Sequence, residues 1–222
     1  MEISERLKTV ASFVRTSRTI ADIGTDHGYI PIYPVSYTHL PFTAGGNVME
    51  GKNIILVGFM GCGKTTIGKK LAKMFDYEFI DMDIEIEEKN GMKISDIFKE
   101  YGEGEFRKME TALCGELSQK SGCVIATGGG VIKNEENMRL LKTNGSVLYI
   151  KASPEHIYKN IKNDKTRPLL DCEDKLERIK TLMEERRPMY EGRSDIAVEI
   201  TGMNSHDAAG LIRETLEKEN MI

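Results

Sequence analysis

Residues 58–65, GFMGCGKT, form the stretch that most restricts how this chain of 222 residues can fold. The apolar run KNIILVG leads into it, and the amphipathic stretch TTIGKKLAKMF overlaps its end and continues beyond it. A short apolar run indicates a buried strand, whereas apolar residues spaced three and four apart indicate a helix. A strand, a glycine loop and a helix in this order are typical of the first strand–helix unit of a parallel sheet.

Alternating strand and helix patterns continue to the end of the chain. We expect four further strands in the stretches YEFID, CVIATGGG, SVLYIKA and IAVEI. Helices are expected at 83–91, at 93–120 and from beyond Gly130 to about Thr143. Three more are expected: one that starts at Pro154, one that ends at Arg186 and one at the C-terminal end. These patterns predict an α/β fold with a central parallel sheet and helices on both faces.

The glycine loop itself matches the phosphate-binding pattern G-x-x-x-x-G-K-[ST]. Its glycines allow backbone amides to turn toward phosphate oxygens at the positive end of the following helix. In this pattern Lys64 reaches the β- and γ-phosphates of a nucleotide, and Thr65 offers its hydroxyl to Mg²⁺. Cys62 is interpreted as a small residue beside main-chain contacts, with a reactive thiol as the alternative.

Two aspartates follow the second predicted strand. FIDMD places Asp81 and Asp83 at the carboxyl end of that strand, where open α/β sheets bind their ligands. At a spacing of two, a strand directs both side chains to the same side. Asp81 is therefore a candidate to bind Mg²⁺ through water, and Asp83 to accept a substrate hydroxyl. A solvated loop or a helix cap is the alternative.

Arginines and glycines supply candidate contacts for an anionic substrate. Arg107 and Glu110 lie three apart on one predicted helical face, where an ion pair would hold a guanidinium that binds a carboxylate. Three glycines, 128–130, end a buried strand where a ligand can approach the main chain closely, with a plain turn as the alternative. Arg186 or Arg187 is a second candidate, with a helix C-terminal cation as the alternative.

The polar stretch KNDKTRPLLDCED interrupts the strand and helix patterns. We interpret it as a mobile lid that closes over a bound nucleotide and excludes water. Arg167 lies within this stretch, directly before a proline. It is the candidate lid residue.

Together these motifs resemble the shikimate kinase family from about residue 52 to the C-terminus. The ordered set GFMGCGKTTIGKKLA, FIDMDIEIE, ISDIFKEYGEGEFRKMET, VIATGGGV, RPLL and ERRPMY carries the resemblance, and other small-molecule kinases share only its first member. The resemblance implies a P-loop nucleoside-monophosphate-kinase-like fold with a lid. It implies ATP- and Mg²⁺-dependent phosphorylation of the 3-hydroxyl of shikimate, in chorismate and aromatic amino acid biosynthesis.

The resemblance also implies a role for each matching residue. ATP would be bound by Gly61, Cys62, Gly63, Lys64, Thr65, Thr66 and Arg167, and shikimate by Asp83, Arg107, Gly129 and Arg186. Lys64, Asp83 and Arg167 would be catalytic, and Thr65 and, through water, Asp81 would hold the metal. The chain has Asn160 where many members have an arginine, and Met203 and Asn204 give no clear match to a further adenine contact.

Residues 1–33 carry a different resemblance. ISERLKTVASFV followed by ADIGTDHGYIPIY is similar to the start of a bacterial tRNA adenine N1-methyltransferase. The resemblance implies that Asp22, Gly24, Asp26 and Gly28 would surround the methionine part of the cofactor. The uncharged stretch PIYPVSYTHLPFTAGG follows, in place of a ribose-binding strand and a catalytic loop.

We therefore expect two parts, a truncated methyltransferase-like fragment with an irregular linker at 1–48 and a kinase domain at 49–222. A gene fusion or an assembly artefact would explain this arrangement, and a genuine extension that packs on the kinase is the alternative. A fragment as short as the first part buries too little surface to fold alone.

Composition limits the remaining alternatives. A net charge of −4 offers no basic surface for nucleic acid or a membrane, and no apolar run reaches the about 20 residues that span a bilayer. The four scattered cysteines favour a reducing cytoplasm. We expect a cytoplasmic monomer whose partners are shikimate and ATP. The competing functions are a gluconate-type P-loop kinase and an RNA-binding or RNA-methylating protein.

Overall fold

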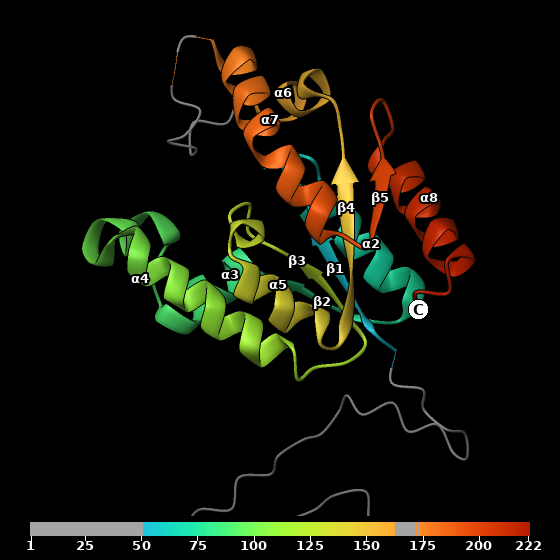
Figure 1. Cartoon of the computed structure of the whole chain (residues 1–222), viewed down its shortest axis with the longest axis horizontal. Coiled ribbons are helices and arrows are strands. Elements are labelled where there is room, and N and C mark those ends of the chain that lie inside the picture. Colours follow the sequence, from blue (N-terminus) through green and yellow to red (C-terminus); the bar gives the residue numbers. More distant parts are fainter. Residues whose placement is uncertain (1–50, 163–171, 173) are drawn as a thin grey trace, which may run out of the picture. The chain divides into compact units, whose positions relative to one another are not determined.

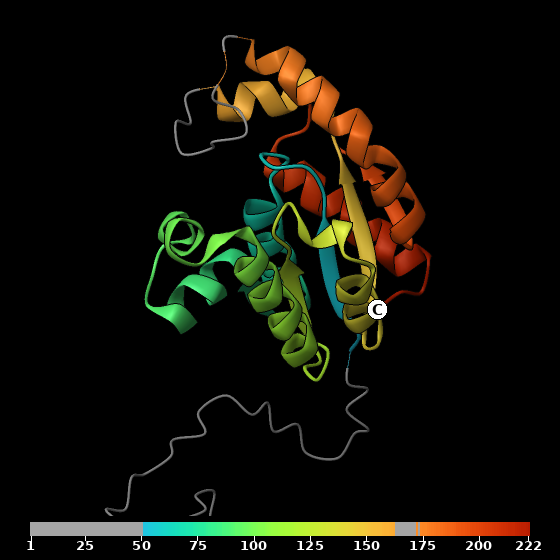
Figure 2. The same cartoon turned by 60° about the vertical axis from the view of Figure 1, so that its left-hand side comes forward.

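The computed structural model describes residues 51–162, 172 and 174–222. The expected fragment and linker at 1–48 and the expected lid arginine, Arg167, lie outside the described residues. Within the described part, five parallel strands form one sheet in the order β2-β3-β1-β4-β5, with helices on both faces (Figure 1, Figure 2). The predicted α/β fold is confirmed.

The strands are β1 (Asn53–Val57), β2 (Glu78–Asp81), β3 (Cys123–Ala126), β4 (Gly145–Lys151) and β5 (Ile196–Glu199). β1 lies at the centre, where Ile55 pairs with Ile125 of β3 on one side and Val147 of β4 on the other. Every residue of β1 and β3 is buried. Helices cover both faces, and therefore these strands appear in the sequence as continuous apolar runs.

The described helices are α2 (Lys64–Phe75), α3 (Met82–Asn90), α4 (Ile94–Leu117), the 3₁₀ helix η1 (Val131–Lys133), α5 (Glu135–Lys142), α6 (Pro154–Ile161), α7 (Lys175–Arg193) and α8 (Ser205–Lys218). Side chains of Ser153 and Asn204 cap the first turns of α6 and α8. α2 begins instead after Gly63, which has no side chain to occupy the N-terminal amides. In the part of the chain that the structure describes, no helix is long and apolar enough to cross a membrane.

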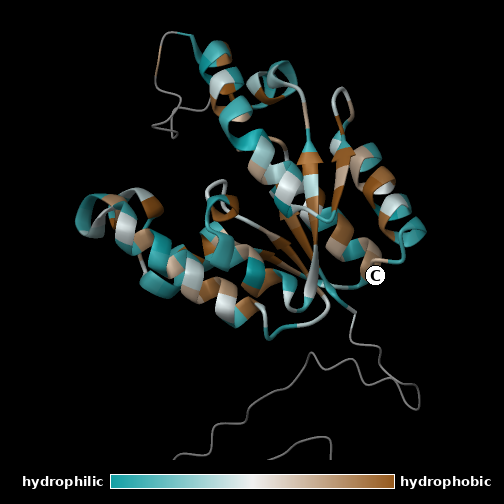
Figure 3. Ribbon diagram, in the orientation of Figure 1, coloured by the Kyte–Doolittle hydropathy of each residue, from teal (hydrophilic) through white to brown (hydrophobic). Residues whose placement is uncertain are grey.

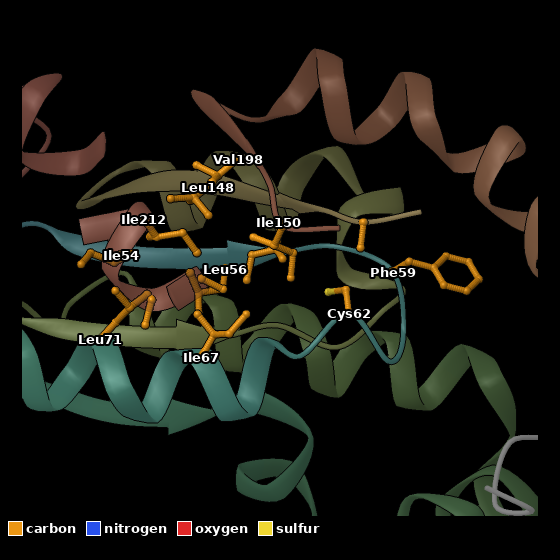
Figure 4. Close-up of a cluster of buried hydrophobic side chains, with 14 of the residues drawn as sticks. Ile54, Leu56, Phe59, Cys62, Ile67, Leu71, Leu148, Ile150, Val198 and Ile212 are labelled. Carbon is orange, nitrogen blue, oxygen red and sulfur yellow. The ribbon is translucent and has the colours of Figure 1, made fainter. Parts of the chain in front are cut away.

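The sheet separates two hydrophobic cores. One includes Leu71 of α2 and Ile212 of α8, and Figure 4 shows these side chains packed against β1. The other includes Leu113 of α4 and Leu141 of α5. Figure 3 shows hydrophobic residues along the strands and hydrophilic residues on the outer helix surfaces. Apolar burial stabilises the fold by about 25 cal/mol per Å², and it fixes the loops at the carboxyl edge of the sheet by holding the helices in place.

Three helix boundaries differ from the expectation. α4 breaks at Gly102, whose φ of 80° is left-handed and favours glycine. The helix expected from beyond Gly130 to about Thr143 is divided into η1 and α5, because Asn134 adopts an extended conformation and caps α5. The helix expected to end at Arg186 continues through Pro188 to Arg193.

The continuation of α7 through Pro188 has a physical cost and a compensation. A proline inside a helix removes one hydrogen bond and costs about 3 kcal/mol. Two residues later Tyr190 is buried, and its ring stacks on Tyr149 of β4 at a centroid distance of 4.8 Å. Burial of an aromatic side chain in such a stack offsets a cost of this size.

Candidate active site

A cavity of about 990 Å³ lies at the carboxyl edge of the sheet. Residues 60–67 of the phosphate loop and the start of α2 line it, together with Asp81, Asp83 and Gly129 from the ends of the neighbouring strands. Residues of α6 and of the loop after β5 complete the lining. Because open α/β sheets bind their ligands at this edge, the cavity is the candidate active site.

Contacts with α6 hold the phosphate loop in shape. Gly61 has a φ of 79° and Gly63 a φ of 100°, values that favour glycine. A Cβ at Gly61 would lie 2.5 Å from Cγ2 of Ile161, so α6 packs directly on the loop. Asn160 of α6 donates a hydrogen bond from Nδ2 to the carbonyl oxygen of Gly61 at 3.0 Å. The asparagine that stands where many family members have an arginine thus supports the loop backbone.

Lys64 lies against the loop's own main chain. Its Nζ donates to the carbonyl oxygens of Gly58 at 2.9 Å and Phe59 at 3.2 Å. Cys62 is buried within the loop, with Sγ 4.0 Å from the same Nζ. This burial agrees with the interpretation of Cys62 as a small packing residue. The amides at the start of α2 face no capping side chain and are suited to phosphate.

Thr65 and Asp81 meet as the phosphate-loop pattern predicts. Thr65 Oγ1 donates to Asp81 Oδ2 at 2.7 Å, and Asp81 Oδ1 accepts the backbone N–H of Asp83 at 3.1 Å. Asp81 ends β2 and caps α3, whereas Asp83 lies in the first turn of that helix. The end of β2 therefore places Asp81 at the cavity as expected, whereas the start of α3, and not strand alternation, places Asp83 there.

The Thr65 and Asp81 pair fits Mg²⁺. This ion prefers oxygen ligands, keeps several waters and binds proteins through one or two side chains plus substrate phosphates. Among the described residues, no group of three or more His, Cys, Asp or Glu side chains could hold a metal ion. A hydroxyl and a carboxylate beside a phosphate loop therefore suit a metal that is bound largely by the nucleotide.

Glycine at position 128 allows two carboxylates to lie beside the end of β3. A Cβ there would be 2.7 Å from Asp83 Oδ1 and 3.1 Å from Glu110 Oε1. Glu110 is buried, and this burial raises the pKa of its carboxyl, while Arg107 lowers it and Asp83 raises it further. Carboxylates from α3 and α4 therefore lie together beside Gly128, and the one from α3, Asp83, also lines the cavity.

Two carboxylates of its own helix hold the guanidinium of Arg107. Nη1 donates to Glu110 Oε2 at 2.6 Å, and Nη2 donates to Glu103 Oε1 at 2.8 Å. The expected ion pair with Glu110 is confirmed. Burial lowers the pKa of Arg107, but the hydrogen bonds with Glu110 and Glu103 outweigh it and raise the pKa overall. The side chain also packs against Gly130, where a Cβ would lie 2.9 Å from Cζ of Arg107.

Arg186 is a buried cation with few partners. It is 5% exposed, whereas Arg187 lies in solvent, so the structure distinguishes the two candidates. Nη1 of Arg186 donates to the carbonyl oxygen of Gly129 at a long 3.4 Å, and Cζ lies 5.5 Å from the centroid of the Phe59 ring. No carboxylate among the described residues forms an ion pair with Arg186. Buried charges are normally paired, so this guanidinium is suited to an anionic ligand.

The structure brings most of the expected site residues together. The cavity is lined by Gly61, Cys62, Gly63, Lys64, Thr65, Thr66, Asp81, Asp83 and Gly129. Arg107 and Arg186 contact the adjacent glycines 130 and 129. Arg167 lies outside the described residues. The sequence analysis missed Glu103, although its spacing of four from Arg107 was a usable signal, and it missed Phe59, for which no local signal exists.

A phosphate loop beside paired arginines and a carboxylate defines a P-loop phosphotransferase for a small anionic acceptor. Comparison with known proteins gives the particular family. A family model described as shikimate kinase matches residues 60–217. The chain belongs to the shikimate kinase family.

Individual relatives agree with this assignment. Shikimate kinase of Thermodesulfovibrio yellowstonii is 41% identical over 75% of this chain and 96% of its own length. Shikimate kinase of Caldanaerobacter subterraneus subsp. tengcongensis is 49% identical over 63% of this chain and 81% of its own length. The solved structure of shikimate kinase from Acinetobacter baumannii in complex with shikimate has a TM-score of 0.72 and 37% identity, covering 78% of this chain and 96% of that one.

A second family model, described as a methyltransferase domain, matches residues 3–53. This match supports a methyltransferase-like segment at the N-terminal end. It overlaps the first strand of the kinase fold by only one residue, Asn53.

Proposed function

We propose that this chain transfers the γ-phosphoryl group of ATP to the 3-hydroxyl of shikimate, a step of chorismate and aromatic amino acid biosynthesis. The observation that carries the proposal is Arg186, a buried guanidinium without a carboxylate partner among the described residues, beside the glycines of the cavity. Together with Arg107, whose guanidinium Glu103 and Glu110 hold, it places two cations near the site for one carboxylate. Shikimate has one carboxylate and adjacent ring hydroxyls.

Different residues at the site have different roles in phosphoryl transfer. Amides of residues 61–66 cradle the phosphates, and Lys64 moves from the loop carbonyls to the β- and γ-phosphates. Asp83 orients the attacking hydroxyl and accepts its proton. Arg107, Arg186 and the main chain at Gly129 hold the acceptor so that its oxygen faces the γ-phosphorus.

Thr65, and Asp81 through water, would hold Mg²⁺, which neutralises charge on the phosphates when bound. Arg167 is the proposed lid residue that contacts ATP and excludes water when the substrates are bound. We further propose that the protein acts as a monomer in the cytoplasm.

The test is ADP release by the full-length chain with ATP and Mg²⁺, comparing shikimate, gluconate and no acceptor. We expect release that depends on shikimate and falls at least a hundredfold in Lys64→Ala, because charge stabilisation by such groups contributes several kcal/mol. Arg186→Met should raise the KM for shikimate, whereas Arg139→Met, at an exposed arginine paired with Glu136, should not. Release with gluconate but not shikimate would refute the proposal.

For the N-terminal segment, we propose that residues 1–48 are a truncated tRNA adenine N1-methyltransferase-like fragment with a linker, and that residues 49–222 form the kinase domain. The match to a methyltransferase domain over residues 3–53 supports the first part. Two assays on the full-length chain test this division. Transfer of a labelled methyl group to tRNA would contradict it, and so would a segment 1–48 that resists limited proteolysis.

A further inference from the structure

The backbone of Phe59 is part of the phosphate loop, whereas its ring contacts Arg186, which we propose to bind the acceptor. It is the second residue of the loop GFMGCGKT, and its side chain is 2% exposed. Figure 4 shows the ring extending away from the core side chains around β1, whereas Cys62 lies on the side of the loop that faces them. The ring instead meets Arg186 of α7, whose Cζ lies 5.5 Å from the ring centroid.

Contact with the Phe59 ring helps to hold the guanidinium of Arg186 in position. Its Nη1 donates to the carbonyl oxygen of Gly129 at 3.4 Å, and the hydroxyl of Tyr190, four residues further along α7, interacts with the same guanidinium. The distance to Gly129 lies beyond the usual range for an N–H···O bond, so this contact restrains the side chain weakly. A cation over an aromatic face is attracted by the ring quadrupole, most strongly where both groups are desolvated, as they are here.

A ring contact also leaves the hydrogen-bonding edge of the guanidinium free. A carboxylate partner from the protein would compete with an acceptor carboxylate for the same N–H groups. A phenyl face stabilises the charge without accepting these donors in their plane. The arrangement therefore holds Arg186 in place while its fork remains open to a ligand.

We propose that Phe59 is a positioning residue for the acceptor, acting through Arg186. This inference rests on the proposed function, in which Arg186 binds the shikimate carboxylate. The aromatic face, and not merely the apolar volume of the side chain, determines how strongly the acceptor carboxylate is bound. A residue of the phosphate loop thus sets affinity for the second substrate.

The first test is Phe59→Leu, which keeps an apolar side chain and removes the ring. The KM for shikimate should rise about thirtyfold and the KM for ATP should change less than twofold, because a desolvated cation–π contact is worth about 2 kcal/mol and each 1.4 kcal/mol is tenfold. Phe75→Leu is the matched control, since Phe75 ends α2 about 16 Å along the helix from Lys64. An unchanged KM for shikimate in Phe59→Leu would overturn the inference.

The second test separates an aromatic effect from a packing defect. Mono-, di- and trifluorinated phenylalanine at position 59 nearly preserve the shape of the ring while weakening the negative potential of its face. The KM for shikimate should rise stepwise with fluorine number at constant melting temperature. A KM that does not follow the number of fluorines would refute the role of the ring face. This series remains decisive even if Phe59→Leu folds poorly.

The third test uses the methyl ester of shikimate and distinguishes failure of the inference from failure of the proposed function. The wild-type chain should prefer the free carboxylate by a large ratio of kcat/KM, and Phe59→Leu should reduce that ratio about thirtyfold. A wild-type ratio near one would contradict carboxylate binding by Arg186 itself. A large ratio that Phe59→Leu leaves unchanged would contradict only the role of Phe59.

Discussion

Alanine at position 130 should disable the acceptor site without unfolding the protein. The added Cβ would meet Nη1 of Arg107 most closely, and it would lie 2.9 Å from Cζ and 3.0 Å from Nη2. Ordinary carbon contacts begin near 3.5 Å, so the guanidinium must move by roughly 1 Å. The backbone of Gly130, with φ −102° and ψ −15°, is open to alanine. Strain therefore falls on a flexible side chain and not on the fold.

The displacement has a calculable effect on binding. Moving Arg107 weakens its 2.6 Å bond to Glu110, and charged hydrogen bonds are worth about 1.5 to 3 kcal/mol. The same shift misaligns the fork that we propose for the shikimate carboxylate. We expect the KM for shikimate to rise between about tenfold and a hundredfold, with the melting temperature within about 2 °C of the wild type.

Steady-state ADP release at varied shikimate and saturating ATP measures this effect. Gly115→Ala is the control, because Gly115 lies on the same helix as Arg107 and a Cβ there meets nothing within 4 Å. An unchanged KM for shikimate in Gly130→Ala would show that Arg107 does not bind the acceptor. An equal rise in the KM for ATP would show that the whole site had been disturbed.

Three further predictions concern the loop, the metal and the thiols. Asn160→Ala should raise the KM for ATP about two- to fivefold, since it removes the hydrogen bond to Gly61, and an unchanged value would contradict this support. Thr65→Val should raise the Mg²⁺ concentration for half-maximal activity while Thr65→Ser should not, which a magnesium titration decides. At pH 8 a thiol reagent should label Cys172 and not Cys114, because burial raises the pKa of Cys114 to about 12 and keeps it protonated; rapid labelling of Cys114 in the folded chain would refute this.

The sequence predicted the fold class and every strand of the sheet, because each strand is buried on both faces or bounded by clear turns. The phosphate loop was predicted with its strand and helix for the same reason. Helix ends were harder. The break at Gly102 and the cap at Asn134 arise from local backbone geometry, whereas the continuation of α7 past Pro188 depends on Tyr190 stacking on another element.

The candidate site shows the same division between local and distant causes. The ion pair of Arg107 and Glu110 followed from helical spacing alone. The sequence could not distinguish Arg186 from Arg187, because the difference depends on where α7 lies relative to the glycines after β3. The contact of Arg186 with Phe59 depends on the same position of α7. Asp83 was assigned to the cavity by a strand argument, although the turn into α3 places it there.

The contact of Lys64 with two carbonyl oxygens of its own loop has a consequence for the kinetics of nucleotide capture. The ammonium holds the carbonyl oxygens of Gly58 and Phe59 together, because it donates to both. The loop therefore keeps its shape before the nucleotide arrives, and little entropy is lost in ordering it. Association exchanges one set of oxygen partners for another, so loop ordering should not limit the rate at which ATP binds.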